Sequence, residues 1–387
     1  MHWPIQPLEI QRRFAPPFCP HRTCFQHRQP DPRRFSYKHD GAYVRADGRR
    51  VPRYHCHTCH GSFSKQSFAT SYFLKRPELL VPVAHGLVNG AAHRQIARMV
   101  GCAPSTVTRL SARLGRHAQL LQVLALLHLP STDTEDTILD HTETFEGTQD
   151  HPIALGTLVG RDSWFVYGVD ANTHRRTGHR STFQELRRQS RTDRDIRGGY
   201  EGSAARLLEL RLRFGPQETR LTVVTDDLEA YARAIRRRGL TSRVEHVVFP
   251  NPERGPKGAP RSPAAIARDQ AMFANDLLHA LIRHCLAHHH RETIAFPRRI
   301  VAALDRIFLF CSWRNFIKGV SERKPDPTTP AMRKGLTREP WSWRRLLARR
   351  LFPERLPVPA SWSEIYRRDW TTPSLPSNAR HDLRLAF

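Results

Sequence analysis

Hydrophobic residues between positions 83 and 117 recur at helical spacing, in two stretches separated by a short break. Gly101 is a typical helix stop, and Pro104 followed by Ser105 is typical of a helix start. The pattern predicts two helices joined by a tight turn, and residues 118–129 continue as an apolar helix. The inward positions of the two helices are Ile96, Ala97 and Val100, then Val107, Leu110 and Leu114.

From residue 131 onward the pattern changes to that of short strands. Polar and apolar residues alternate over 138–142, and apolar runs follow at 152–160, 163–171, 221–225 and 244–250. A helix is predicted between the last two of these runs. The order of strands and helices predicts a mixed α/β domain, and it is consistent with a ribonuclease-H-like sheet.

Two aspartates stand out because they lie in or beside these apolar strands. Asp140 is inside the first strand, where an unpaired acid is unfavourable, and Asp226 ends a later one. Carboxylates at neighbouring strand ends would repel each other unless divalent cations bind between them. Two alternatives stay open: Asp226 only caps the next helix, or Glu143 or Glu146 is the functional acid of the first strand.

A third carboxylate from a following helix would complete such a metal site. Asp305 is the candidate, because it is the one acid in a strongly apolar helix predicted over 300–316, and Glu292 is the alternative. Asp305 could instead be an exposed acid paired with Arg306 or Arg298. With Mg²⁺ or Mn²⁺ bound, a carboxylate cluster of this kind can support substitution at phosphorus.

The charge of the chain points to a nucleic acid as its partner. The 387 residues include 62 Lys and Arg against 36 Asp and Glu, a formal net charge of +26. Self-repulsion at this charge works against a compact state unless a polyanion binds. Most of the basic residues are arginines, which form bidentate contacts with phosphate, although biased codon use would produce the same excess over lysine.

Four of the seven cysteines form two closely spaced pairs near the N-terminus. No apolar run approaches the ~20 residues of a membrane span, and no signal-peptide core is present, so we expect a reducing, cytoplasmic and nucleoid-associated setting. Pairs of this spacing joined by short strands are typical of a zinc ribbon with structural Zn²⁺. The alternatives are a nearby histidine in place of one thiolate, or buried reduced thiols. The predicted ligands are Cys19, Cys24, Cys56 and Cys59, and the nearby histidines are His21, His27, His57 and His60.

The helical pair next to this ribbon predicts a helix-turn-helix whose second helix enters the major groove of DNA. Small hydroxyls and arginines on its outer face suit contacts with phosphates and base edges. An ordinary helical hairpin with a solvated basic face is the alternative. The predicted contact residues are Ser105, Thr106, Thr108, Arg109 and Arg113.

In their order, these segments resemble bacterial insertion-sequence transposases of the DDE type, over roughly residues 17–350. No single motif is decisive, but the order of the motifs is fairly specific. The resembling stretches are FCPHRTC and RYHCHTCHGSFS for the ribbon, LDHTETF and VVTDDLEAY for the first two acids, the region 275–316 for the third acid, and the segment that begins TTPAMRKG.

The resemblance implies an enzyme that binds element ends and performs metal-dependent strand cleavage and strand transfer. It makes Asp140, Asp226 and Asp305 the ligands of Mg²⁺ or Mn²⁺ and the catalytic acids. The family normally has Glu at the third position, so either Asp305 works, or Glu292 serves, or catalysis is weakened or lost. The other functions that stay open are a domesticated or inactive transposase that only binds DNA, and a ribonuclease-H-like nuclease that cleaves without joining.

The partners implied are double-stranded DNA, as element ends and target, and further copies of the chain, because two DNA ends must be held at once. Phosphate contacts are also expected from Arg291, Arg298 and Arg299, with a solvated helix face as the alternative. The predicted domains are the ribbon with its N-terminal extension (1–75), the helix-turn-helix with a linker helix (76–130), the catalytic domain (131–320) and a basic C-terminal tail (321–387).

Overall fold

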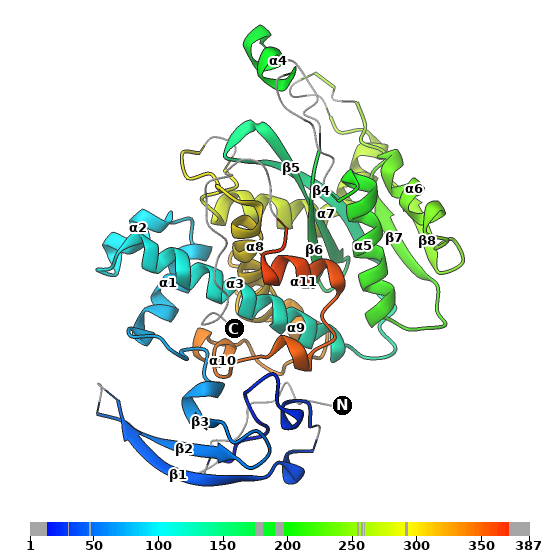
Figure 1. The fold of residues 1–387 in the computed structure, drawn as a ribbon. Helices are drawn as coiled ribbons and strands as arrows, with labels where there is room; N and C mark the ends of the chain where they lie inside the picture. Colours follow the sequence, from blue (N-terminus) through cyan, green and yellow to red (C-terminus); the bar gives the residue numbers. More distant parts are fainter. Residues whose placement is uncertain are drawn as a thin grey trace.

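The computed structural model describes residues 14–29, 31–45, 48–174, 181–189, 197–253, 255–256, 258, 260–290 and 293–370. A small sheet near the N-terminus is followed by three helices and then by a larger sheet covered with helices (Figure 1). The mixed α/β, multidomain architecture predicted from the sequence is therefore confirmed.

The small sheet is antiparallel and contains β1 (Tyr37–Val44), β2 (Arg50–Cys56) and β3 (Ser62–Ser64) in that order. It has a separate hydrophobic core, which is small and includes three of the paired cysteines. A core of this size stabilises a module only weakly without a covalent or metal crosslink. The core residues are Cys19, Cys24, Phe35, Tyr54, Cys56 and Phe63.

The three helices are α1 (Leu80–Val88), α2 (His93–Met99) and α3 (Pro104–Leu127). The predicted break between the last two is confirmed, since Gly101 has a φ of +62° and Pro104 stands in the first turn of α3. α3 is one helix of 24 residues, so the apolar stretch expected as a linker continues it directly. All its residues from 110 to 126 are buried, which makes α3 a central element of the core.

The larger sheet has the order β6-β5-β4-β7-β8. β4 pairs antiparallel with β5, and β5 with β6, whereas β4 pairs parallel with β7, and β7 with β8. The bounds of these strands are β4 Thr137–Glu146, β5 Thr148–Gly160, β6 Val166–Thr173, β7 Leu221–Thr225 and β8 Val244–Val248. The periodicity predicted the strands but not the two helices between β6 and β7, which are α4 (Thr182–Gln189) and α5 (Gly199–Phe214).

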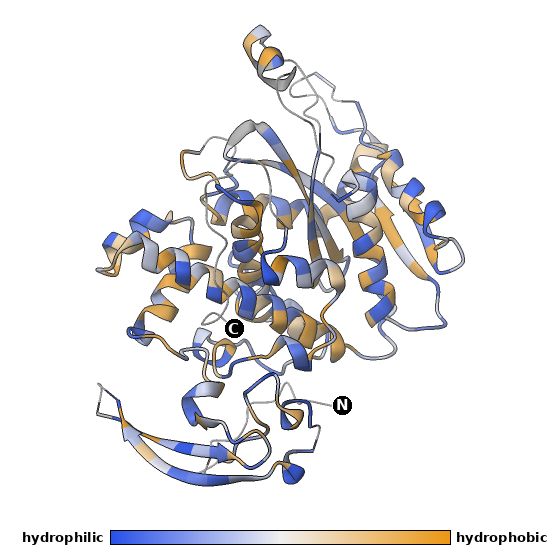
Figure 2. Ribbon diagram, in the orientation of Figure 1, coloured by the Kyte–Doolittle hydropathy of each residue, from blue (hydrophilic) through white to orange (hydrophobic). Residues whose placement is uncertain are grey.

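Helices pack on both faces of this sheet. Neighbouring residues of a strand point to opposite faces. In β4, His141 contacts Ser203 of α5 and Tyr231 of α6 (Glu229–Arg237), whereas Asp140, which also accepts from the Tyr231 hydroxyl at 3.4 Å, contacts Asn275 of α7 (Pro263–Cys285). The remaining long helix, α8 (Ile300–Phe316), packs between α3 and β6. Hydrophobic residues are frequent along the strands of the larger sheet in Figure 2, and one continuous core joins α1, α2 and α3 to this sheet.

The described part of the segment after residue 320 is packed into the molecule and is not a free basic tail. It contains α9 (Pro330–Arg333), α10 (Trp343–Leu346) and α11 (Ala360–Arg367). The Trp362 indole is buried and donates to the carbonyl of Val169 in β6 at 3.1 Å. The backbone N–H of Arg350 donates to the carbonyl of Phe68 at 2.8 Å. The segment therefore ties the small sheet to the larger one.

Candidate functional site

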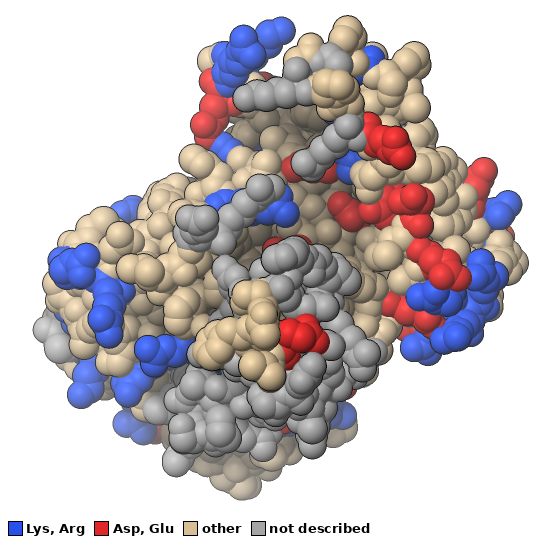
Figure 3. Space-filling model, turned by 90° about the horizontal axis from the view of Figure 1, so that it is seen from above, with Lys and Arg blue, Asp and Glu red and all other residues tan. Residues whose placement is uncertain are grey.

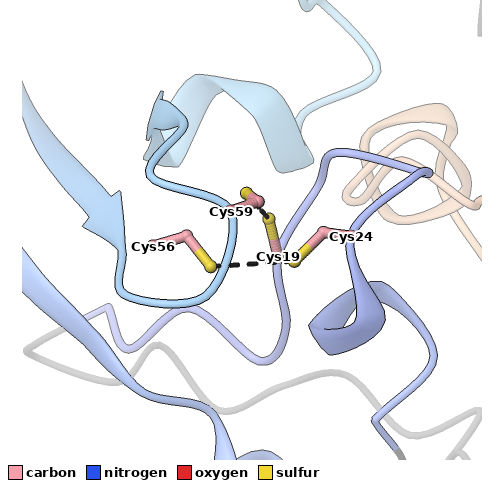
Figure 4. Close-up of side chains that lie close together, drawn as sticks. All are labelled: Cys19, Cys24, Cys56 and Cys59. Carbon is pink, nitrogen blue, oxygen red and sulfur yellow. Dashed lines mark hydrogen bonds between the residues drawn. The ribbon is translucent and has the colours of Figure 1, made fainter.

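The four paired cysteines converge at one end of the small sheet (Figure 4). Their sulfur atoms all lie within 4.8 Å of one another. Cys19 Sγ is 3.7 Å from Cys59 Sγ, and Cys24 Sγ is 3.8 Å from Cys56 Sγ. Four thiolates about 2.3 Å from a tetrahedral Zn²⁺ would be about 3.8 Å apart, so the spacing suits this ion. The cluster thus has the donor set and the dimensions to bind a metal such as zinc.

Tight backbone turns hold each cysteine pair in place. The N–H of Cys24 donates to the carbonyl of His21 at 2.9 Å, and the N–H of His60 donates to the carbonyl of Cys56 at 3.0 Å. Burial is the main cause that raises the pKa of the Cys19 thiol and that of the Cys24 thiol. A bound cation would therefore have to displace the protons, as thiolate metal sites generally require.

Among the four nearby histidines, His21 lies closest to the cluster. Its Nδ1 is 3.6 Å from the sulfur atoms of both Cys19 and Cys59. Gly61 makes room for this ring, because a Cβ built on Gly61 would be 2.3 Å from two of its atoms. His27 Nδ1 instead bonds the Cys19 carbonyl at 2.8 Å. The four-thiolate group therefore matches the structure better than a set with an imidazole.

The second candidate centre lies where β4 and β7 run side by side. These parallel strands pair Thr137 with Val223 and Ile138 with Val224. Two residues further along the same register, Asp140 and Asp226 occupy neighbouring positions. Burial, followed by the charge of Asp226, raises the pKa of Asp140 from 3.8 to about 7. The structure thus brings together two of the acids selected from the sequence.

A buried polar network fixes the Asp140 carboxylate on the α7 face. Asn275 Nδ2 donates to Asp140 Oδ2 at 3.3 Å, and the Thr157 hydroxyl donates to Asn275 Oδ1 at 2.7 Å. His279 Nε2 lies 2.8 Å from the same hydroxyl, and burial lowers the pKa of His279 to about 3. A neutral His279 therefore contacts the Thr157 hydroxyl through one ring nitrogen, and the Thr157–Asn275 bond turns the amide N–H of Asn275 toward Asp140.

Asp226 is held at the start of the connection to α6. Its Oδ1 accepts from the N–H of Leu228 at 3.1 Å, so the capping interpretation describes part of its environment. Its Oδ2 accepts from Asn251 Nδ2 at 3.1 Å. Asn251 Oδ1 in turn accepts from Arg268 Nε at 3.1 Å. This chain of bonds leads from Asp226 to α7.

The acid that α7 contributes is Asp276, which the sequence analysis missed. Arg268 forms a two-point ion pair with Asp276, and the charge of Asp276 is one cause of the raised pKa of Asp140. A signal for Asp276 was present in the sequence. Asn275, Asp276 and His279 are polar residues at helical spacing, in a segment that was considered only as the surroundings of the third acid.

Asp305 has a different environment from the one expected. It is buried in α8 against α3, where a Cβ on Gly115 would lie 2.4 Å from the Asp305 Cβ. Arg368 Nη2 donates to Asp305 Oδ2 at 2.5 Å, and fully buried Arg116 is within electrostatic range. Asp305 is thus neither the exposed helix acid nor a partner of Arg306 or Arg298, but the counter-charge of two internal arginines. Glu292 lies outside the described residues.

The two neighbouring glutamates of β4 occupy separate environments. Glu143 is largely exposed and accepts from the Tyr200 hydroxyl at 2.9 Å. Glu146 is buried, and its Oε1 accepts from the N–H of Ile300 at the start of α8 at 2.6 Å. Glu146 therefore anchors α8, and Asp140 remains the acid of this strand that faces Asp226.

The positions proposed to contact DNA divide into two groups. Ser105, Thr108 and Arg109 of α3 are exposed, and Thr106 is half-buried. Arg113 is buried, and its Nη1 donates to the carbonyls of Thr70 and Tyr72 at 2.8 and 2.7 Å. The prediction that Arg113 contacts DNA is therefore wrong, because the buried part of α3 begins three residues earlier.

The other basic candidates lie near the start of α8. Arg298 is exposed, Arg299 is half-buried at the N-terminal cap of the helix, and Arg291 lies outside the described residues. In Figure 3, Asp and Glu side chains gather beside a hollow on this face with a few Lys or Arg side chains among them, and larger groups of Lys and Arg lie toward the edges.

In the described part of the chain, the cysteine cluster is the only group of three or more His, Cys, Asp or Glu side chains whose ligand atoms all lie within 4.8 Å of one another. The acids around Asp140 are linked through charge and hydrogen bonds, but they do not reach that spacing. No described helix is long and apolar enough to cross a membrane. Comparison of the chain with protein-family models and with curated proteins gave no match.

Proposed function

We propose that this protein is a DDE-type transposase, which binds the ends of a DNA element and joins them to target DNA with the help of divalent cations. The observation that carries the proposal is the placement of Asp140 on β4 and Asp226 after β7 at neighbouring positions, with Asp276 on α7 joined to Asp226 through Arg268 and Asn251. Carboxylates gathered in a partly buried site repel one another, and a bound divalent cation removes this repulsion.

The topology of the larger sheet supports this proposal. Three antiparallel strands followed by two parallel ones, in the order β6-β5-β4-β7-β8, correspond to a ribonuclease-H-like sheet. In that arrangement the first and fourth strands lie side by side, and Asp140 within β4 and Asp226 just after β7 stand where both can bind the same metal. This assignment of the fold is part of the proposal, and it replaces Asp305 with Asp276 as the third acid.

The residues of the chain would act on DNA in defined roles. Bound between the three carboxylates, Mg²⁺ or Mn²⁺ would activate the attacking oxygen and stabilise the leaving oxygen at phosphorus. Asp140 must lose its proton to bind a cation, and Asn275 orients the carboxylate for this through its hydrogen bond to Oδ2. The exposed residues of α3, led by Arg109, would position the duplex together with the small sheet.

A strand-transfer assay tests the proposal. The substrate is a duplex that carries the inverted repeat flanking the gene, incubated with target plasmid and Mn²⁺. We expect the wild-type protein to cleave and join it, and Asp140→Asn, Asp226→Asn and Asp276→Asn each to reduce joining by roughly 100-fold or more while the duplex is still bound. Glu209→Gln is the matched control, because Glu209 is an exposed acid on α5 that pairs with Arg238.

The products separate the functions that the sequence left open. Joined DNA supports a transposase, cleavage without joining indicates a nuclease, and a bound but unchanged duplex indicates a DNA-binding protein without catalysis. Full strand transfer by the Asp140→Asn protein would show that the acidic centre is not the catalytic site.

A further inference from the structure

One cation of the chain already lies among the acids of the candidate site. The guanidinium of Arg268 on α7 makes a two-point ion pair with Asp276, with Nη2 3.4 Å from Asp276 Oδ1 and Nη1 closer to Oδ2. Its Nε donates to Asn251 Oδ1 at 3.1 Å, and Asn251 donates to Asp226 Oδ2. Only 15% of the Arg268 side chain is exposed. A single guanidinium thus connects two of the three acids.

The charge of Arg268 also affects Asp140, the remaining acid of the centre. Its positive charge acts on Asp140 in the direction opposite to that of Asp226 and Asp276. It therefore offsets part of the repulsion among three carboxylates that share a partly buried site. An arginine carries one charge and remains protonated at any physiological pH. A divalent ion carries twice that charge and competes for the same carboxylate oxygens.

We propose that Arg268 is the resident counter-ion of the acidic centre: it holds Asp276 in the metal-free protein and is displaced when Mg²⁺ or Mn²⁺ binds. The inference rests on the proposed function, since it concerns the same carboxylates. It accounts for the spacing of the acids, because an Asp276 engaged by Arg268 is not free to close on a shared ion with Asp140 and Asp226. The metal affinity of the site is then set by a competition within the chain.

Calorimetric titration of the zinc-loaded, full-length protein with Mn²⁺ tests this competition. Arg268→Gln removes the competing charge, so we expect it to bind Mn²⁺ roughly three- to tenfold more tightly than the wild type. Arg268→Lys keeps the charge but loses the two-point geometry, and we expect a smaller increase. Arg237→Gln is the matched control, because Arg237 is an exposed arginine paired with Glu201, and the Mn²⁺ affinity of this variant should stay within about twofold of the wild type.

Thermal unfolding gives a second readout that a purely structural role would not produce. Without Mn²⁺ the Arg268→Gln protein should melt below the wild type, because its carboxylates lack a counter-ion. With saturating Mn²⁺ the two melting temperatures should approach each other, since the divalent ion takes over that role.

Two results would overturn the inference, and they are distinguishable. If the wild type binds Mn²⁺ through Asp140 but Arg268→Gln binds it equally or more weakly, Arg268 does not compete with the metal and the proposed function is unaffected. If wild type, Arg268→Gln and Asp140→Asn all show the same absence of Mn²⁺ binding, the acidic centre is not a metal site, and both proposals fail together.

Discussion

At the scale of single residues, identical side chains have opposite roles in this protein according to their surroundings. Asp140 faces other acids, and its pKa is raised to about 7 by burial and by Asp226. Asp305 is more deeply buried, but it faces Arg368 and Arg116. The first carboxylate lies among acids whose repulsion Arg268 offsets only in part, whereas the second supplies negative charge to two arginines. Only the first environment favours a bound cation.

The raised pKa of Asp140 predicts a pH-dependent stability. Between pH 3.8 and about 7 the folded state holds a proton that the unfolded state releases, so the free energy of unfolding should fall as the pH rises through this window. Asp140→Asn removes the titration. In zinc-loaded protein without Mg²⁺ or Mn²⁺, we expect the variant to exceed the wild type by on the order of 2–4 kcal/mol at pH 8 and to match it near pH 4. Denaturant unfolding across this range measures the difference, and a constant difference would contradict the prediction.

Replacing Asp276 and Asp305 separates a metal ligand from a structural acid. Asp305→Asn leaves two buried arginines without their counter-charge, so we expect a loss of about 3 kcal/mol or more in the free energy of unfolding. Asp276 is 41% exposed, and its replacement by Asn should weaken Mn²⁺ binding roughly tenfold or more with little effect on folding. Chemical denaturation and Mn²⁺ titration of both variants check this. A stable Asp305→Asn protein that no longer binds Mn²⁺ would show that Asp305, and not Asp276, is the third metal ligand.

At the scale of elements, the pattern along the chain predicted what local sequence determines. The turn within each cysteine pair and the helix break between Gly101 and Pro104 are each determined by a few neighbouring residues. The predicted grouping of the four cysteines and the predicted helix break are both confirmed. The third acid could not be chosen this way, because α7 and α8 both follow the sheet in sequence. Only the packing shows that α7 lies against β4 while α8 is held between α3 and β6. Asp305 stood out as an acid in an apolar helix and was therefore expected to bind a metal. Its burial is explained by two arginines that are distant in sequence.

α3 shows the same division along a single helix. Arg109 is exposed, whereas Arg113, one turn later, is buried and bonded to two backbone carbonyls of the connection from the small sheet. We expect Arg109→Ala to weaken DNA binding about tenfold, to reduce its dependence on salt concentration and to leave the melting temperature unchanged. Arg113→Ala should instead lower the free energy of unfolding by about 1.5–3 kcal/mol. Electrophoretic mobility shifts and thermal melts of both variants measure these effects. If both variants fold and weaken DNA binding equally, the distinction between a DNA-contacting Arg109 and a structural Arg113 is refuted.

At the scale of the whole molecule, two hydrophobic cores of unequal size are tied together by the C-terminal segment. The large core includes α1, α2, α3 and the β4–β8 sheet, whereas the small one lies around the four cysteines. Phe352 packs on Phe18 with ring centroids 5.2 Å apart, and Arg355 donates to the carbonyl of His27. The small sheet is therefore attached at several points, but its own stability depends on the cysteine cluster.

We propose that the cysteine cluster holds zinc, and removing this metal should then unfold one part of the molecule and spare the other. Without metal the small core cannot offset the chain entropy of residues 14–68, whereas the large core does not include them. We expect Cys56→Ser to lose its stoichiometric zinc, measured by mass spectrometry of the metal, and to become protease-sensitive in this region while the fragment from α1 onward stays resistant. Cys102→Ser, a half-buried thiol outside the cluster, should behave as the wild type. If the small sheet recognises the element ends, the Cys56→Ser protein should also lose specific end binding. Cooperative loss of the whole fold would show that the two cores are not independent, and a full complement of zinc in the variant would show that the cysteine cluster does not hold the metal.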